Sequence, residues 1–265
     1  MREKVMRDVL VLIHDDVGQQ SRLQAAFDLV RASQGKLLCV DLAEPDAKGA
    51  RATRGGSLVM EAEVAPLATV RDQIEASGLS AQWIERRDAM LPALSETAAL
   101  ADLIVMSAPR ADLFPPTYAA ISELLVTADT PIVAVPPESP GICLNGEVLI
   151  CWDGSREAHH AMVSAIPLLR RASTVTIVEI DDGSLKLPAS QAQTLLAQRN
   201  IASHVRSDLA FGEKAAFVIL EQIDLLKADY VVMGGFGHSR LVENIFGGVT
   251  ERLLHESPVP LFLKH

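Results

Sequence analysis

The sequence predicts an α/β protein of two tandem domains, each a five-stranded parallel sheet with helices on both faces. Three observations carry this prediction. The chain has 265 residues, 49% of them hydrophobic, which suits two domains with packed cores. Its two halves repeat one another. Within each half, short apolar runs alternate with helical segments, which is the pattern of a parallel sheet covered on both faces.

The repeat consists of aligned blocks at nearly constant offsets. The pairs are 10–15 with 148–153 and 37–42 with 175–180 at an offset of 138, then 101–106 with 228–233 and 130–133 with 257–260 at an offset of 127. The first half is therefore longer by 11 residues. We expect this extra length between its second and third strands, around Glu44 to Glu63.

The elements are clearest in the second half, where the strands are short apolar runs and the helices are longer amphipathic segments. We expect strands near residues 147–152, 174–180, 202–206, 229–233 and 259–263, and helices near 155–171, 188–198, 213–227 and 246–256. The halves are joined by Pro136-Pro137-Glu138-Ser139-Pro140-Gly141, whose prolines can continue neither a helix nor a central strand. The predicted domains are residues 1–137 and 147–265, with a linker at 138–146.

Charge and cysteine content exclude some classes of function. The chain has 24 Lys and Arg against 34 Asp and Glu, a formal net charge of -10, which argues against binding to nucleic acid or an anionic membrane. The first apolar run, Val9 to Ile13, is too short for a signal peptide or a membrane span. Cys39, Cys143 and Cys151 show no paired spacing. We expect a cytoplasmic protein.

In an open parallel sheet, ligands bind beyond the carboxyl ends of the strands, where the strand order reverses. In the second half, Asp153 follows the first strand. Its carboxylate can accept hydrogen bonds from ribose hydroxyls, or it can cap the following helix. Both interpretations stay open for this residue alone.

Two glycine clusters follow the fourth strand of the second half. Gly234-Gly235-Phe236-Gly237 comes first, and Gly247-Gly248-Val249-Thr250 begins the last predicted helix. Exposed backbone N–H groups and a helix N-terminus can together hold phosphate groups. The pattern is neither a Walker A loop nor a dinucleotide fingerprint, because Arg240 stands where the third glycine would be. The alternative is that these glycines only form tight turns.

The glycine clusters, running into Ser257-Pro258-Val259-Pro260, resemble the C-terminal signature of the universal stress protein family. The resemblance spans both halves and implies a tandem member with an adenine nucleotide α-hydrolase-like fold. In nucleotide-binding members this signature holds the phosphates of ATP, while an Asp after the first strand and an apolar residue at the end of the second strand hold ribose and adenine. Carried over, these roles fall on Asp153, Ile180, Met233, Gly234, Gly237, Gly247, Gly248 and Val249, with Arg240 as an auxiliary phosphate contact.

The chain also departs from the family pattern. Gly248 replaces the usual Ser or Thr, so only its backbone N–H is left for a phosphate. Trp152 is larger than the residue usual before the Asp, and it either stacks on a base or fills the pocket. In the first half, residues 107–110 contain Pro109 and no glycine, and residues 120–122 replace the second glycine cluster. We therefore expect no nucleotide in the first half.

No dedicated catalytic centre is predicted. His159 and His160 are neighbours on a helix and point about 100° apart, so we expect solvated side chains rather than a metal pair. His238 lies inside the glycine segment, with either ordinary exposure or a phosphate contact. No Ser, His and Asp order and no paired carboxylates suggest a nucleophile or a base. Any ATP hydrolysis would be slow and incidental.

Three functions therefore remain in order of preference. The first is a stress-response protein that binds ATP or a related adenine nucleotide, with or without Mg²⁺, as a sensor or regulator. The second is a scaffold that has lost nucleotide binding and contacts an unknown protein partner, which Gly248 and Trp152 favour. The third is a slow hydrolase. We expect the halves to pack as an internal pseudo-dimer through Pro131–Val135 and Val259–Leu263, and a homodimer is compatible with the family.

Overall fold

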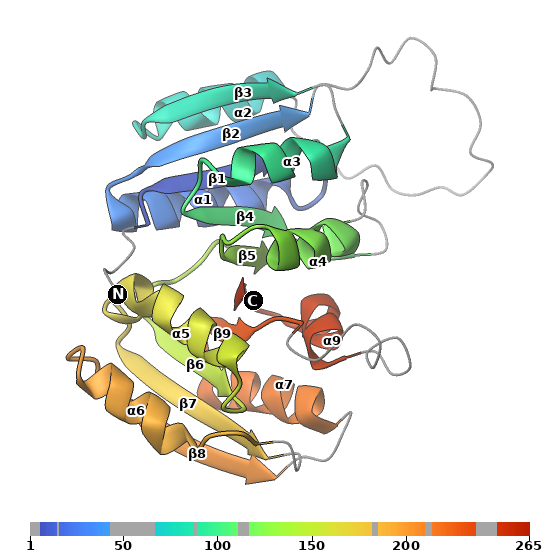
Figure 1. Ribbon diagram of the computed structural model, residues 1–265. Coiled ribbons are helices and arrows are strands. Elements are labelled where there is room, and N and C mark those ends of the chain that lie inside the picture. Colours follow the sequence, from blue (N-terminus) through green and yellow to red (C-terminus); the bar gives the residue numbers. More distant parts are fainter. Residues whose placement is uncertain are drawn as a thin grey trace.

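The computed structural model describes residues 6–14, 16–42, 67–86, 89–110, 117–181, 185–209, 214–236 and 248–265 (Figure 1). Its strands are β1 (Asp8–Ile13), β2 (Lys36–Leu42), β3 (Ala81–Arg86), β4 (Leu103–Ser107), β5 (Ile132–Val135), β6 (Glu147–Trp152), β7 (Thr174–Asp181), β8 (His204–Leu209), β9 (Tyr230–Gly234) and β10 (Leu261–Lys264). Its helices are α1 (Gln19–Ser33), α2 (Leu67–Ala76), α3 (Met90–Ala98), α4 (Thr117–Thr127), α5 (Arg156–Leu169), α6 (Ala189–Ala197), α7 (Lys214–Leu226) and α9 (Val249–Glu256).

The predicted α/β class is confirmed, with five parallel strands from each half. The strand order is β3-β2-β1-β4-β5 in the first half and β10-β9-β6-β7-β8 in the second. Neighbouring strands within each half run parallel. In both halves the order reverses beside the first strand, so each half has its own switch point, between β1 and β4 and between β6 and β9.

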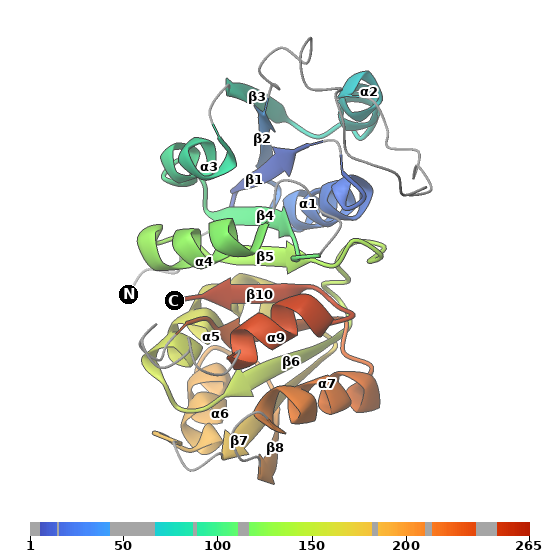
Figure 2. The same ribbon diagram turned by 90° about the vertical axis from the view of Figure 1, so that its right-hand side faces the viewer.

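The two halves meet edge to edge through the strands that the sequence predicts. β5 pairs antiparallel with β10, with Phe262 opposite Val133 (Figure 2). This pairing joins the two five-stranded units into one ten-stranded sheet. The sequence predicts a separate sheet for each half and does not predict this continuity. Every residue of β5 and β10 is buried. The junction is therefore part of the core.

Helices cover both faces of this sheet. Buried side chains of α1, α2, α5 and α6 pack on one face, and those of α3, α4, α7 and α9 pack on the other. Each of these two apolar layers contains residues of both halves. Consecutive strand residues alternate between the layers, as in Leu261 against one and Phe262 against the other. The strands are consequently apolar throughout, as a doubly covered sheet requires.

The extra length of the first half lies where the sequence predicts it. Leu38 pairs with Gln82, and Thr176, which follows Leu38 by 138 residues, pairs with His204. His204 follows Gln82 by only 122 residues, so the first half holds 16 additional residues before its third strand. It then lacks 5 residues before its fourth. Residues 43–66, which include the predicted position of this extra length at Glu44 to Glu63, lie outside the described residues.

The predicted linker packs against the first half. Ile142 and Leu144 are buried in an apolar layer. The backbone N–H of Ile142 donates a hydrogen bond to Asp28 Oδ2 at 3.1 Å, and the Ser21 hydroxyl donates one to the carbonyl oxygen of Pro137. The linker and the residue before it, Pro137, are thus anchored to α1 at two points. The domain limits at 137 and 147 stay predictions within one continuous core.

Candidate functional site

The switch point of the second half brings the ends of three neighbouring strands together. β6 lies between β7 and β9, so Asp153 after β6, Ile180 near the end of β7 and Gly234 at the end of β9 share one edge of the sheet. The family resemblance assigns a ligand role to all three. Their side-by-side placement follows from the parallel pairing of β6 with β7 and of β6 with β9.

Asp153 is a half-buried residue whose groups partly serve the local fold. Its Oδ1 accepts a hydrogen bond from the Ser155 backbone N–H at 2.8 Å, and its carbonyl oxygen accepts one from the Lys186 N–H at 2.9 Å. Ser155 is the N-cap of α5, and its hydroxyl accepts from the Ala158 N–H at 3.1 Å. The helix cap is therefore Ser155, and Asp153 Oδ2 has no partner within the part of the chain that the structure describes.

Trp152 fills the core and does not face a base site. Its side chain is buried in the layer beneath α5 and α6, and its indole N–H donates to the carbonyl oxygen of Leu187 at 2.8 Å. The Leu187 backbone crosses directly over Gly154, which has a φ of +72°. Of the two roles open to Trp152, packing is the one that the structure supports.

Ile180 and Met233 lie on the other face of the sheet from Trp152, in the layer beneath α7 and α9. Their exposed fractions are 7% and 4%. Ile180 is therefore almost wholly buried near the carboxyl end of β7. It can form an apolar floor for a flat ring but not a deep adenine pocket.

Gly234 has a structural reason to lack a side chain. A Cβ atom at this position would lie 2.6 Å from the backbone nitrogen of Ala158 and 2.7 Å from the carbonyl carbon of Glu157. The first turn of α5 thus packs directly on the end of β9. This contact explains Gly234 without a ligand, so its presence alone is weak evidence for a phosphate site.

The N-terminus of α9 lies beside the end of β9. Gly248 is the N-cap of this helix and, having no side chain, leaves its first turn without a side-chain cap. A Cβ at Gly235 would lie 3.9 Å from Thr250 Cγ2, so the first turn of α9 contacts the chain just after β9. Val249 is the first residue of the helix. Uncapped N–H groups at such a turn are suited to an anion.

Three of the predicted site residues, Gly237, Arg240 and Gly247, lie outside the described residues, as does His238. Their roles stay predictions. The described part of the site therefore consists of Asp153, Ile180, Met233, Gly234, Gly248 and Val249.

The corresponding switch point of the first half contains a buried arginine that the sequence interpretation missed. The Arg22 side chain is 0% exposed. Its Nε donates to the carbonyl oxygen of Leu12 at 2.7 Å, and its two terminal nitrogens each lie 3.2 Å from a different oxygen of Asp16. Further bonds go to the Ser107 hydroxyl, Gln19 Oε1 at 3.0 Å and the His14 carbonyl oxygen at 3.1 Å. The guanidinium thus joins the ends of β1 and β4.

Burial of the Asp16 carboxyl raises its pKa, but the polar contacts of His14 and Arg22 together lower it by more. The pKa of Asp16 therefore lies below its usual value of 3.8. His14 Nδ1 lies 3.4 Å from Asp16 Oδ2 without the geometry of a hydrogen bond. Arg22 is the residue that hydrogen-bonds both oxygens of this carboxylate. The carboxylate is ionised at neutral pH.

The two switch points differ in whether the strand or the helix side carries the glycine. Ser107 of β4 corresponds to Gly234 at the offset of 127. In the first half the glycine is instead on the helix side, at Gly18, directly opposite the Ser107 side chain. Arg22 corresponds to His160, which lies 3.4 Å from the carbonyl oxygen of His265. One sequence signal for the buried guanidinium exists, because Arg22 interrupts the apolar stripe of α1.

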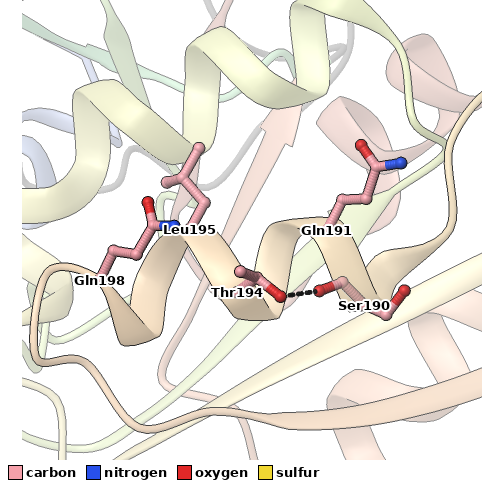
Figure 3. Close-up of a pocket in the computed structure, with 5 residues that line it drawn as sticks. All are labelled: Ser190, Gln191, Thr194, Leu195 and Gln198. Carbon is pink, nitrogen blue, oxygen red and sulfur yellow. Dashed lines mark hydrogen bonds between the residues drawn. The ribbon is translucent and has the colours of Figure 1, made fainter.

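No alternative site of comparable definition occurs within the described ranges. A pocket lies along α6, lined by Ser190, Gln191, Thr194, Leu195 and Gln198, and Thr194 Oγ1 donates to the Ser190 carbonyl oxygen at 2.8 Å (Figure 3). It includes no predicted site residue. Among the described residues, no three His, Cys, Asp or Glu side chains are grouped to hold a metal ion. In that same part of the chain, every helix is too short or too polar to span a bilayer.

His159 and His160 are both half-buried, with ring centroids 6.1 Å apart. Burial lowers the pKa of His159 from its usual value, and the nearby His160 and Arg199 lower it further. The prediction of solvated side chains is therefore only partly right, because both rings are half-buried. The rings are tilted by 44°.

Comparison with known proteins supports the family resemblance. Residues 189–263 match the model of the universal stress protein family. This range runs from α6 into β10 and includes Met233 and the glycine clusters, but not Asp153 or Ile180.

Two solved structures share the fold over nearly the whole chain. A universal stress protein from Archaeoglobus fulgidus DSM 4304 is 16% identical, with 97% of each chain covered and a TM-score of 0.70. A functionally unknown protein from Pseudomonas aeruginosa PAO1 is 16% identical, with 98% of this chain and 92% of that chain covered and a TM-score of 0.64. At these identities the likeness shows the fold.

Among curated proteins, an uncharacterized protein from Schizosaccharomyces pombe (strain 972) is 30% identical over 138 residues. The match covers 45% of this chain and 23% of that protein. The chain therefore spans about a quarter of the length of this relative.

Proposed function

Because this chain carries a universal stress protein domain at residues 189–263 and has the tandem fold of such a protein over its whole length, we propose that it binds ATP or a related adenine nucleotide in its second half. In this proposal the protein is cytoplasmic, and the bound nucleotide lets it act as a sensor or regulator in a stress response. One observation carries the proposal. Asp153, the end of β9 and the uncapped N-terminus of α9 share one switch point, whereas Arg22 occupies the other.

The division of roles within the proposed site follows from the groups present. Asp153 Oδ1 is held by the Ser155 N–H at 2.8 Å, which fixes the carboxylate and leaves Oδ2 to accept hydrogen bonds from the ribose hydroxyls. The end of the Ile180 side chain forms the apolar floor beneath adenine. N–H groups of Gly248 and Val249 at the start of α9 donate to the phosphates, together with Gly237, Gly247 and Arg240.

Local charge favours the magnesium complex of the nucleotide. The first turns of α5 and α9 carry Glu157 and Glu251, and Asp153 adds a third carboxylate. These groups repel a bare triphosphate, whereas bound Mg²⁺ neutralises part of its charge. We therefore expect tighter binding of Mg-ATP than of ATP alone, with the ion held mainly by the phosphates.

Isothermal titration with ATP and with Mg-ATP tests the proposal. Asp153→Ala removes the ribose acceptor, and we expect affinity to fall about tenfold or more, since charge-assisted hydrogen bonds contribute roughly 1.5–3 kcal/mol. Gly237→Val places a side chain in the proposed phosphate cradle and should reduce binding steeply. Ala111→Val in the first half is the matched control and should bind as the unmodified protein does. Mass spectrometry of denatured protein would identify a nucleotide that co-purifies.

A scaffold without nucleotide binding is the second candidate, and one observation favours it. Packing against Ala158 already accounts for Gly234, and Gly248 supplies no hydroxyl. Absence of both heat and thermal shift at millimolar Mg-ATP would establish this candidate. Slow hydrolysis is a weaker third candidate, because none of the described residues of the proposed site is a nucleophile paired with a base.

A further inference from the structure

A helix of the first half packs against the chain just after β9 of the second. Tyr118 and Leu125 are seven residues apart on α4 and therefore share one face of that helix. A Cβ at Gly235 would lie 3.3 Å from Leu125 Cδ1, and the Tyr118 and Phe236 rings have centroids 6.4 Å apart. Figure 2 shows α4 and α9 on the two sides of the β5–β10 junction. The first half thus reaches the proposed site of the second.

Phe236 needs such support because of its backbone. Its φ of +57° lies in the left-handed region, which is unfavourable for a bulky side chain unless the surroundings hold it there. The ring is buried, with 8% exposed, and meets the Tyr118 ring edge to face at 68°. Gly235 is held on its other side, where its N–H donates to the Lys264 carbonyl oxygen at 3.0 Å.

Tyr118 also contacts the helix that follows the glycine clusters. Its ring stacks on His255 of α9, with centroids 5.7 Å apart and an angle of 28° between the planes. His255 lies in the last turn of α9, whereas Gly248 is the N-cap of that helix. One side chain of the first half therefore touches Phe236, which precedes Gly237, and the far end of the helix that starts after Gly248. Because α9 is a single helix, this contact also relates Phe236 to its N-terminus.

We propose that Tyr118 is a positioning residue for nucleotide binding, so that the first half completes the site of the second. Its ring fixes the left-handed turn at Phe236 relative to α9, and the N–H groups at the start of that helix are thereby held in place relative to the end of β9 before the ligand arrives. This inference rests on the proposed function. It gives the first half, whose own switch point is closed by Arg22, a direct part in binding.

The test is titration of the full chain with Mg-ATP. Tyr118→Ala should weaken binding roughly 3- to 10-fold, the value of an aromatic contact of this kind, whereas Tyr118→Phe keeps the ring and should stay within about twofold. Val126→Ala is the matched control, since Val126 lies on α4 but is 42% exposed. Circular dichroism at the titration temperature verifies that every variant is folded.

Hydrogen exchange without nucleotide supplies a second readout. Backbone amides in peptides that cover residues 230–236 or 248–256 should exchange faster in Tyr118→Ala than in the unmodified chain or in Val126→Ala. Unchanged exchange, or faster exchange with unchanged affinity, would overturn the inference. If the unmodified protein binds no nucleotide, the proposed function and the binding role of Tyr118 both fail. The exchange rates then decide only whether Tyr118 stabilises the end of β9 and α9.

Discussion

The guanidinium of Arg22 and the carboxylate of Asp16 form a paired contact, with Nη1 and Nη2 each 3.2 Å from one carboxylate oxygen. The pair lies at the switch point of the first half. The equivalent switch point of the second half is the proposed nucleotide site. Six hydrogen bonds from the Arg22 side chain occupy all five of its N–H donors. The guanidinium therefore has no N–H left for a ligand.

Asp16→Asn should destabilise the protein by about 2–3 kcal/mol at neutral pH, because it leaves the buried charge of Arg22 without its counterion. Since the pKa of Asp16 is lowered in the folded protein, its stabilisation is present above about pH 4 and is lost as the pH falls below that value. Urea unfolding of both proteins between pH 3 and 7 measures this. A difference as large at pH 3 as at pH 7 would contradict it. Asp224→Asn, at an exposed ion pair, is the control.

Gly234→Ala should cost about 1–3 kcal/mol, as expected when a methyl group is forced into a packed core. The added Cβ would lie 2.6 Å from the Ala158 backbone nitrogen, so the first turn of α5 must move. Gly235→Ala is the matched control, because its nearest neighbour is the flexible end of Leu125 at 3.3 Å. Thermal unfolding of both variants decides the matter. Equal stability of the two would mean that α5 does not pack on β9 as described.

Trp152→Phe should lower stability by about 1–2 kcal/mol and leave Mg-ATP affinity within about twofold. The substitution removes the hydrogen bond to Leu187 and part of a buried ring, but Trp152 faces α5 and α6 rather than a ligand. Denaturant unfolding and titration give the two values. Loss of binding in a variant of unchanged stability would instead favour stacking of Trp152 on the base.

In the native protein, Cys143 should be the thiol that reacts with a thiol reagent at pH 8, because it is exposed. Burial, opposed by the charge of Arg71 and assisted by that of Asp41, raises the pKa of the Cys39 thiol to about 12. Burial and the charge of Asp153 raise the pKa of Cys151. Both thiols should react only after unfolding. We expect one thiol to react per native chain and three per denatured chain. Cys143→Ser should abolish the reaction of the native protein.

The sequence alone determined the repeat, the α/β class and the order of elements, because these depend on local apolar periodicity and on residues that interrupt it. The predicted strand at 147–152 is observed at Glu147–Trp152, and the predicted helix at 213–227 at Lys214–Leu226. The glycine spacing also identified the second half as the candidate binding half. Such signals are carried by neighbouring residues and survive without any knowledge of the fold.

The tertiary structure alone decided which side chains meet at the switch points. Arg22 and Ser107 are 85 residues apart in the chain, and Tyr118 reaches Phe236 across the junction of the two halves. Periodicity places such residues on a helix face but does not say what faces them. The packing of α1 on β4 fixes the first of these contacts, and the antiparallel pairing of β5 with β10 fixes the second. Contacts of this kind depend on long-range packing, which no local pattern in the sequence encodes.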